Sequence, residues 1–212
     1  IFNIEKLDWI NWQWQKSKYL EKLHTAGQKI DPDLKIEEPR KGQFKYTLST
    51  SEKQTQFTEA RANLLLSICG QHIPNELKSE TTILQKALIT VEERVLKAPN
   101  EALENIKFYF EIPEYNKELL THEKMKVDLI QAKDSLIAAK ETLEQLDDYS
   151  LEALEEALIK KVQEIGIKNG QLLWPIRAAL SGQNFSPGVF EIAWTLGKKE
   201  TLKRIESALE KL

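Results

Sequence analysis

The sequence predicts an all-α protein made of two helical subdomains, one in residues 1–118 and one in residues 119–212. Only 8 of the 212 residues are Gly and 7 are Pro, and they stand where helices are expected to end. Apolar residues recur three or four positions apart along most of the chain, which is the spacing of the buried face of a helix. Apolar residues make up 41% of the sequence, enough to bury a core.

The N-terminal segment is predicted as a helix over residues 4–23, followed by the least helical part of the chain. The apolar stripe of this helix consists of Ile4, Leu7, Ile10, Trp14 and Leu20. Trp9 and Trp12 lie off the stripe, so we expect the helix to contact other groups on more than one side. In residues 24–50, Asp31-Pro32-Asp33 indicates a turn. The alternation of Phe44, Tyr46 and Leu48 fits either a short strand or an extended excursion.

From residue 52 onward the sequence predicts helices separated by Gly and Pro. The first covers 52–69 and ends at Gly70, a second is capped by Thr82 and ends at Pro99, and a third covers 101–110 before Pro113. The expected buried stripes are Phe57, Ala60, Leu64 and Ile68 in the first helix and Leu84, Leu88, Val91 and Val95 in the second.

Residues 122–147 show the most regular apolar spacing, alternating three and four positions. The residues concerned are Leu129, Ala132, Leu136, Ala139, Leu143 and Leu146. This pattern fits a coiled-coil seam or a helical hairpin within one domain. Because a dimeric coiled coil usually needs a longer run of heptads, we favour the hairpin.

The C-terminal part is predicted as four further helices. The first is capped by Ser150 and ended by Gly166; two short ones lie near 171–181 and 187–196; the last covers 198–211. Ser186 is the expected cap and Pro187 the first residue of the 187–196 helix. The expected buried residues are Leu151, Leu154, Leu158, Val162 and Ile165 in the first of these helices and Leu202, Ile205 and Leu209 in the last.

The charge is unevenly distributed. The net charge is −3, which disfavours a protein that coats long nucleic acids through phosphate contacts. Residues 118–158 contain 11 acidic and 4 basic residues, a balance of −7, whereas residues 159–212 contain 9 basic and 5 acidic residues, a balance of +4. If the protein binds RNA, we expect the contact in the basic C-terminal third.

The sequence contains no pattern of a catalytic, metal or cofactor site. Phosphate-binding glycine loops and nucleophile elbows are absent. Cys69 and His72 have a C-x-x-H spacing, but structural zinc requires four ligands, so we expect a helix end with a buried thiol and an exposed imidazole. A single cysteine fits a reducing cytosol, and no stretch is apolar enough to span a membrane.

The segment from Arg177 to Val189 is the main candidate for binding. It reads as a helix end, a Gly stop, a short loop and the start of a second helix, whose first backbone N–H groups can bind a phosphate or the edge of a base. Arg177 offers a planar fork of donors and can face Ser186 across the loop. The same pattern also fits an ordinary helix–turn–helix corner with a surface arginine.

Motifs in three regions carry a family resemblance. They are Pro175-Ile176-Arg177, Ala179-Leu180-Ser181-Gly182, Ser186-Pro187-Gly188-Val189-Phe190-Glu191-Ile192, Leu196-Gly197-Lys198-Lys199, the opening Phe2 to Asn11, and Glu93-Arg94-Val95 with Phe108-Tyr109-Phe110. Together they resemble the region after the catalytic domain of bacterial-type glutamyl-tRNA synthetases, which closes with P-L-R-x-A-L-T-G, S-P-G-L-F-E-I and L-G-K-E. The resemblance is weakest at 24–50, where Arg40 to Thr50 looks like an insertion.

The resemblance implies an all-helical array that reads the anticodon of tRNA(Glu). In the family, the residues matching Arg177, Ser186, Pro187 and Val189 surround anticodon bases. The arginine matching Arg94 contacts the third base and implies a preference for cytosine over guanine.

The resemblance also implies a fragment without chemistry, because the family's catalytic signatures are absent here. The missing catalytic domain would lie upstream in the same polypeptide, against Trp9, Trp12 or Trp14, and would use ATP and magnesium; this chain is expected to hold no cofactor. We expect a cytoplasmic monomer. Two alternatives remain: a helical protein-interaction module without RNA binding, supported by the acidic stretch 118–158, and a degenerate paralogue that has lost its tRNA.

Overall fold

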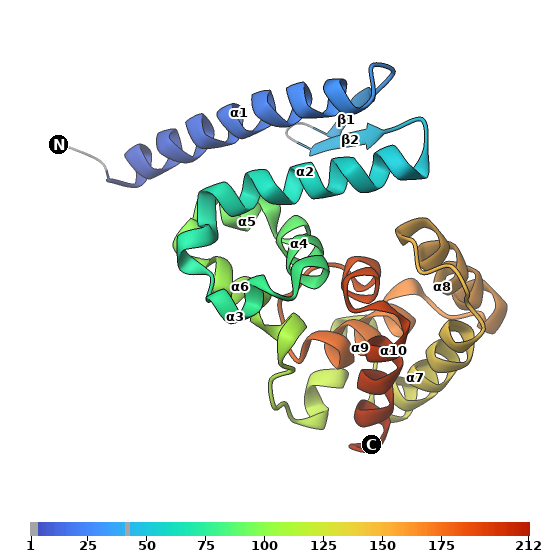
Figure 1. Ribbon diagram of the computed structural model, residues 1–212. Helices are drawn as coiled ribbons and strands as arrows, with labels where there is room; N and C mark the ends of the chain where they lie inside the picture. Colours follow the sequence, from blue (N-terminus) through green and yellow to red (C-terminus); the bar gives the residue numbers. More distant parts are fainter. Residues whose placement is uncertain (1–3, 41–42) are drawn as a thin grey trace. The chain divides into compact units, whose positions relative to one another are not determined.

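A computed structural model describes residues 4–40 and 43–212, and this part of the chain contains ten α-helices and one two-stranded sheet (Figure 1). The all-α prediction is therefore confirmed. The chain divides into two compact units, Ile1–Glu104 and Asn105–Leu212. The boundary between the functional subdomains expected at 118/119 stays a prediction. No described helix carries an apolar stretch long enough to cross a lipid bilayer.

The first unit begins with a long helix and a β-hairpin. Its elements are α1 (Ile4–Ile30), β1 (Lys35–Arg40), β2 (Gln43–Thr47), α2 (Ser51–Cys69), α3 (Asn75–Lys78), α4 (Thr81–Thr90) and α5 (Glu92–Lys97). Helix α6 (Ala102–Phe110) contains the division between the units. Helix α1 runs beyond the predicted residue 23, because Leu23 and Gly27 are buried, and it stops at the predicted turn of Asp31 to Asp33.

The hairpin confirms a strand at Tyr46 and adds a partner strand that the sequence did not indicate. Strands β1 and β2 pair antiparallel, with Ile36 opposite Tyr46. The segment Lys35–Arg40 contains few residues with a high β propensity, and Pro39 lacks an N–H. Pairing with β2, rather than the propensity of its own residues, therefore makes this segment a strand. The predicted Phe44 side chain lies outside the described side chains.

A buried aspartate fastens the base of this hairpin. The Asp31 carboxylate accepts hydrogen bonds from the backbone N–H of Ser49 (2.6 Å) and from Lys53 Nζ (2.9 Å) on α2. Hydrogen bonds to the charged form stabilise it. The Ser49 N–H above all, followed by Lys53, therefore holds the pKa of Asp31 well below its usual range.

The core of the first unit differs in detail from the predicted stripes. In α2 the buried residues are Phe57, Ala62, Leu65 and Cys69, whereas Ala60, Leu64 and Ile68 of the predicted stripe are only partly covered. Leu84, Leu88, Val91 and Val95 are all buried as predicted. They lie on two helices rather than one, because Val91 leaves the helical conformation (φ −117°, ψ 19°). Thr82 is inside α4 and does not cap it, since Glu80 occupies the cap position.

A charged cluster joins four elements of the first unit. Arg61 on α2 binds both carboxylate oxygens of Glu92 on α5, with 2.9 Å between Arg61 Nε and Glu92 Oε1. The Tyr19 hydroxyl of α1 donates to the same carboxylate, and the Arg61 guanidinium lies 6.0 Å from the ring centroid of Tyr46 on β2. Burial above all, and then the Glu92 charge, raises the pKa of Tyr19.

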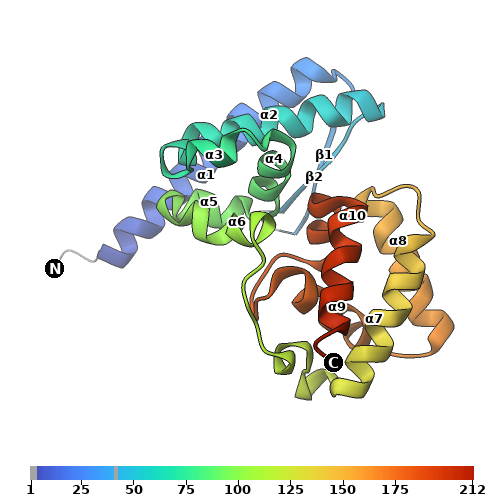
Figure 2. The same ribbon diagram turned by 60° about the horizontal axis from the view of Figure 1, so that its bottom comes forward.

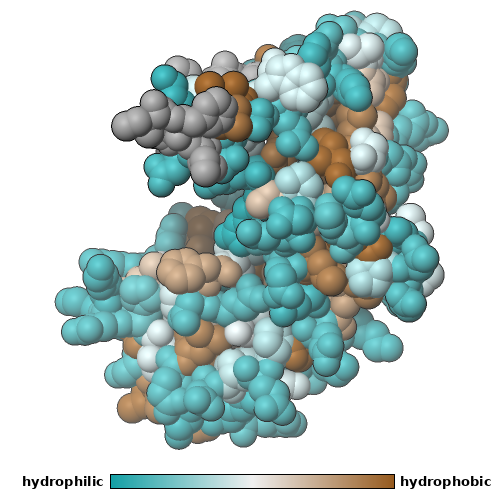
Figure 3. Space-filling view, turned by 90° about the vertical axis from the view of Figure 1, so that its left-hand side faces the viewer, coloured by the Kyte–Doolittle hydropathy of each residue, from teal (hydrophilic) through white to brown (hydrophobic). Residues whose placement is uncertain are grey.

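Exposed apolar side chains of the first unit come from the start of α1. On the face drawn in Figure 3, hydrophobic groups form patches between hydrophilic ones. The exposed large apolar residues of α1 are Leu7, Trp9, Ile10 and Trp14. Trp9 is 58% and Trp14 66% exposed, so the first turns of α1 present an apolar surface that the first unit leaves open.

The second unit consists of the end of α6 followed by four further α-helices (Figure 2). They are α7 (Leu129–Glu144), α8 (Leu151–Ile165), α9 (Asn169–Ser181) and α10 (Val189–Leu209). Helix α7 packs against all three others. The apolar stripe of residues 122–147 is therefore used for helix packing within one domain, as favoured from the sequence. Ser150 caps α8 through its side chain, and Gly166 ends α8 in the left-handed conformation, both as predicted.

The predicted break at Gly197 is present within α10, where φ is 70° and ψ is 172°. Beyond it, Ile205 is buried as predicted, whereas Leu202 and Leu209 are only partly covered. The inward face instead includes Thr201, Arg204 and Ala208. Sequence periodicity missed this face because it contains a charged residue.

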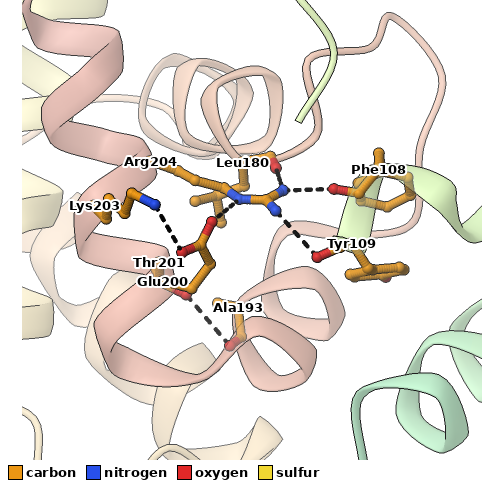
Figure 4. A network of polar contacts seen from close by, with 8 residues as sticks. All are labelled: Phe108, Tyr109, Leu180, Ala193, Glu200, Thr201, Lys203 and Arg204. Carbon is orange, nitrogen blue, oxygen red and sulfur yellow. Dashed lines mark hydrogen bonds and ion pairs between the residues drawn. The ribbon is translucent and has the colours of Figure 1, made fainter. Parts of the chain in front are cut away.

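Arg204 is 3% exposed and binds the ends of two helices (Figure 4). Its Nη1 donates to the carbonyl oxygens of Phe108 and Leu180, both at 2.7 Å, and its Nη2 donates to Tyr109 O at 3.1 Å. Its Nε pairs with Glu200 at 2.9 Å. These carbonyls lie in the last turns of α6 and α9, where helices leave acceptors unsatisfied and their dipoles are negative. Arg204 therefore fixes the C-terminal end of α9.

Candidate nucleic-acid interface

The candidate site centres on Arg177, near the end of α9. Its Nη1 donates to Ser186 Oγ at 2.9 Å, and its Nη2 donates to the carbonyl oxygen of Asn184 at 3.0 Å. The prediction that Arg177 faces Ser186 across the loop is thus confirmed. A guanidinium has five N–H donors. Two of these are used here, so three remain without a bonded acceptor among the described residues.

The Arg177 guanidinium packs against one of a pair of aromatic side chains. The Arg177 guanidinium carbon lies 4.4 Å from the ring centroid of Trp174, one turn earlier on α9. Trp174 Nε1 donates to Leu119 O at 3.2 Å, and the His122 ring stands edge-on to Trp174 with centroids 4.1 Å apart. Burial lowers the pKa of Arg177, but stacking on the tryptophan face offsets part of the lost solvation. Arg177 is therefore held in one orientation.

Sequence reasoning missed Trp174, Leu119 and His122. The spacing of three residues places Trp174 on the same helical face as Arg177, which was a usable signal. Leu119 lies in the 3₁₀ helix Lys117–Leu120, and His122 lies just before the 3₁₀ helix Glu123–Met125. Both are about fifty residues away from Trp174 in the chain. Only the fold brings them to Trp174.

The loop after α9 is constrained at both ends. Gly182 ends α9 with φ 63°, and a Cβ there would lie 3.0 Å from the carbonyl oxygen of Pro113, so the position requires glycine. Ser181 Oγ donates to Arg177 O at 2.8 Å and accepts from Gln183 N at 3.2 Å. The loop therefore starts from a fixed direction.

The predicted helix start at Ser186 and Pro187 was wrong. Helix α10 begins at Val189, and Gly188 is its N-cap without a side-chain cap bond. Ser186 lies two residues before this cap, and its hydroxyl instead accepts from Arg177 and donates to Pro187 O at 3.2 Å. Pro187 precedes the cap rather than opening the helix.

The N-terminus of α10 carries its own negative charge. A Cβ on Gly188 would lie 2.2 Å from Glu191 Oε2, so this carboxylate folds back over the cap, where the helix dipole favours it. The negative charge of Glu191 would repel a phosphate at this place, whereas the uncharged edge of a base would not be repelled. Val189, the first residue of α10, is only 4% exposed, so its side chain belongs to the core of the second unit.

The remaining sequence candidates lie elsewhere. Arg94 is on α5 in the first unit, where it is exposed. Cys69 is buried and His72 exposed, as expected, and burial raises the pKa of the Cys69 thiol to about 11. Among the described residues, no three His, Cys, Asp or Glu side chains cluster to hold a metal.

The fold and the site define an all-α module in which an arginine is stacked on a tryptophan and bonded to a loop. The sequence model of the family described as anticodon binding domain matches residues 56–209. The chain therefore belongs to the anticodon binding domain family. The match begins within α2, after α1 and the β-hairpin.

The chain is similar to several glutamate–tRNA ligases. It is 43% identical over 114 residues to that of Clostridium tetani, covering 53% of this chain and 23% of the relative. It is 36% identical over 137 residues to that of Clostridium acetobutylicum, covering 64% of this chain and 28% of the relative. The chain thus spans about a quarter of the length of these relatives.

A solved structure shares the fold. It is the glutamate tRNA ligase from Elizabethkingia meningosepticum in complex with its amino acid, with a TM-score of 0.58 and 22% sequence identity. The superposition covers 77% of this chain and 33% of that structure. At this identity, the similarity concerns the fold alone.

Proposed function

We propose that this chain recognises the anticodon of tRNA(Glu) as part of a glutamate–tRNA ligase. The observation that carries this proposal is the Arg177 guanidinium, fixed by Ser186, Asn184 and Trp174 with donors still available. It lies within the range matched by the anticodon binding domain family, and the similar proteins named above are glutamate–tRNA ligases. A preorganised arginine fork suits the edge of an unpaired base.

Each candidate residue receives a distinct role. Arg177 donates to a base, and Ser186 orients Arg177. Pro187 contacts a base through its ring, and Val189 contributes its backbone N–H. Arg94 reads the third anticodon base and favours the cytosine of glutamate anticodons over the guanine of glutamine anticodons. The Glu191 carboxylate at the α10 N-terminus supports base edges rather than phosphates as the ligands there.

The chain contributes recognition, and the chemistry belongs to an upstream catalytic domain. That domain would use ATP and magnesium to activate glutamate, while this chain binds neither. The exposed apolar side chains at the start of α1, among them Trp9 and Trp14, are suited to contact the catalytic domain. The protein would act as a monomer in the cytoplasm.

The test is the affinity of the chain for an anticodon stem-loop RNA at fixed salt. We expect a stem-loop with the UUC anticodon to bind more tightly than the same stem-loop with UUG. Arg177→Ala should weaken UUC binding about 5- to 150-fold, as the loss of about 1–3 kcal/mol requires. Arg177→Lys is the matched control for charge, because it keeps the cation but loses the fork.

Equal binding of UUC, UUG and an unrelated hairpin would overturn the proposal. If no RNA is bound, a protein-interaction module becomes the better interpretation. ATP–pyrophosphate exchange by the rigorously purified chain would contradict the assignment of chemistry to another domain.

A further inference from the structure

Phe185 is the most exposed large hydrophobic side chain of the residues that the structure describes, at 84%. Burying a phenylalanine stabilises a protein by about 1.5–3 kcal/mol, and here the fold leaves that stabilisation unused. Phe185 stands in the loop between α9 and α10, flanked by the polar residues Asn184 and Ser186. Phe185 is a candidate contact because it lies between two residues that bind Arg177, and not because of its exposure alone.

The residues on both sides of Phe185 are hydrogen-bonded to one guanidinium. Arg177 Nη2 binds the carbonyl oxygen of Asn184, and Arg177 Nη1 binds the hydroxyl of Ser186. The loop is also tied at its start, where Gln183 N donates to Ser181 Oγ. Folding has therefore already ordered the segment that presents the ring, so a ligand does not bear the cost of ordering it.

We propose that Phe185 stacks on the face of an unpaired base in the anticodon loop, beside the base whose edge Arg177 contacts. This inference rests on the proposed function and extends it from hydrogen bonding to stacking. Proteins that bind single-stranded RNA commonly place aromatic rings against bases, because every base has an apolar face. An exposed ring next to a donor-rich guanidinium supplies both kinds of contact within one loop.

The surrounding charges favour a base over a phosphate as the ligand. A phenyl ring has no hydrogen bond to offer a phosphate, and the Glu191 carboxylate covers the nearby helix start. A base stacked on Phe185 gains contact area without bringing a charge close to Glu191.

The experiment compares four variants of the 212-residue chain for binding to the UUC stem-loop. Phe185→Ala and Phe185→Leu remove the ring, and Phe185→Tyr keeps it. Ile130→Ala on α7 is the matched control, since Ile130 is 74% exposed in the same unit. We expect Phe185→Ala and Phe185→Leu to bind about 5- to 150-fold more weakly. Phe185→Tyr should stay within about threefold, and Ile130→Ala should bind like the wild type.

Two further measurements separate stacking from other effects. The salt dependence of binding should keep its slope in all four variants, because no phosphate contact is lost. With 2-aminopurine placed in turn at each anticodon position, one position should be quenched by the wild type and by Phe185→Tyr but not by Phe185→Leu. Equal thermal midpoints would show that the variants remain folded, as expected for an exposed side chain.

The outcomes distinguish this inference from the proposed function. If the wild type fails to bind the UUC stem-loop, the proposed function itself fails. If the wild type binds and Arg177→Ala weakens binding while Phe185→Ala does not, only the stacking role is overturned. If Phe185→Leu binds as tightly as the wild type, an apolar contact replaces stacking and the inference is wrong.

Discussion

Arg204 donates a 2.7 Å hydrogen bond to the carbonyl oxygen of Leu180, and this bond joins the last helix of the chain to the end of α9. Leu180 stands three residues after Arg177, just before the loop that presents Phe185. The orientation of the candidate site is therefore supported by a buried cation from a distant part of the sequence. The stability of the second unit should therefore depend on Arg204.

Replacing Arg204 with alanine should lower the free energy of unfolding by about 3–5 kcal/mol. The variant leaves three buried carbonyl oxygens without their donor, and it removes one of the two cations that pair with Glu200. Urea unfolding followed by circular dichroism measures the effect. Lys203→Ala is the control, since Lys203 is 73% exposed and should change stability by less than about 0.5 kcal/mol. A loss in Arg204→Ala no larger than in the control would contradict the role of Arg204.

Gly182→Ala should destabilise the protein by about 1–2 kcal/mol and weaken RNA binding. The left-handed backbone at φ 63° disfavours a Cβ, and that Cβ would also press on Pro113 O. Gly70→Ala provides the comparison, because Gly70 has φ −59° and open space around its Cβ position. Thermal melts and stem-loop binding of the two variants should differ. Identical behaviour would show that the loop tolerates a different start.

Asp31 should make the protein sensitive to acid. Its pKa in the folded state lies below its ordinary value of 3.8, so the carboxylate contributes stability at pH values above that value. This contribution is lost as the pH falls from about 4 towards the folded-state pKa. Asp31→Asn should therefore flatten the decline of stability between about pH 4 and pH 2. Asp33→Asn, which removes an exposed carboxylate, should retain the steep decline; a parallel decline in both variants would argue against Asp31.

Arg94→Gln should narrow the difference in affinity between stem-loops that end in C and in G at the third anticodon position. Arginine has donors only, whereas glutamine can donate and accept, so the substitution relaxes the preference for an acceptor-bearing base edge. Because Arg94 is exposed, the variant should fold normally. The ratio of the two dissociation constants is the measurement. An unaltered ratio would remove Arg94 from the reading of the third base.

Local signals in the sequence were sufficient for much of the secondary structure. Helix α8 is capped by Ser150 and ended by Gly166 as predicted, and Gly182 and Gly197 interrupt the helices where expected. These positions were predictable because a cap or a positive φ depends on a few neighbouring atoms. The position of Arg177 opposite Ser186 was likewise predictable, since only a short loop separates them. The stripes Leu84–Val95 and Ala132–Leu143 followed from periodicity.

Other features depend on partners that sequence spacing does not reveal. Strand β1 forms because β2 pairs with it. Ser186 bonds to Arg177, and α10 begins only after Gly188. Periodicity would place Arg204 at the surface, yet carbonyls of α6 and α9 converge on it and compensate its burial.

The sequence by itself therefore determined the helical class, the family motifs and the loop that carries the candidate site. Only the tertiary structure decided how that loop is held: Trp174 beneath Arg177, His122 against Trp174 and Arg204 at the end of α9. The physical reason is that helix boundaries arise from contacts within a few residues. The burial of a charge and the stacking of distant rings arise from contacts between segments that only folding brings together.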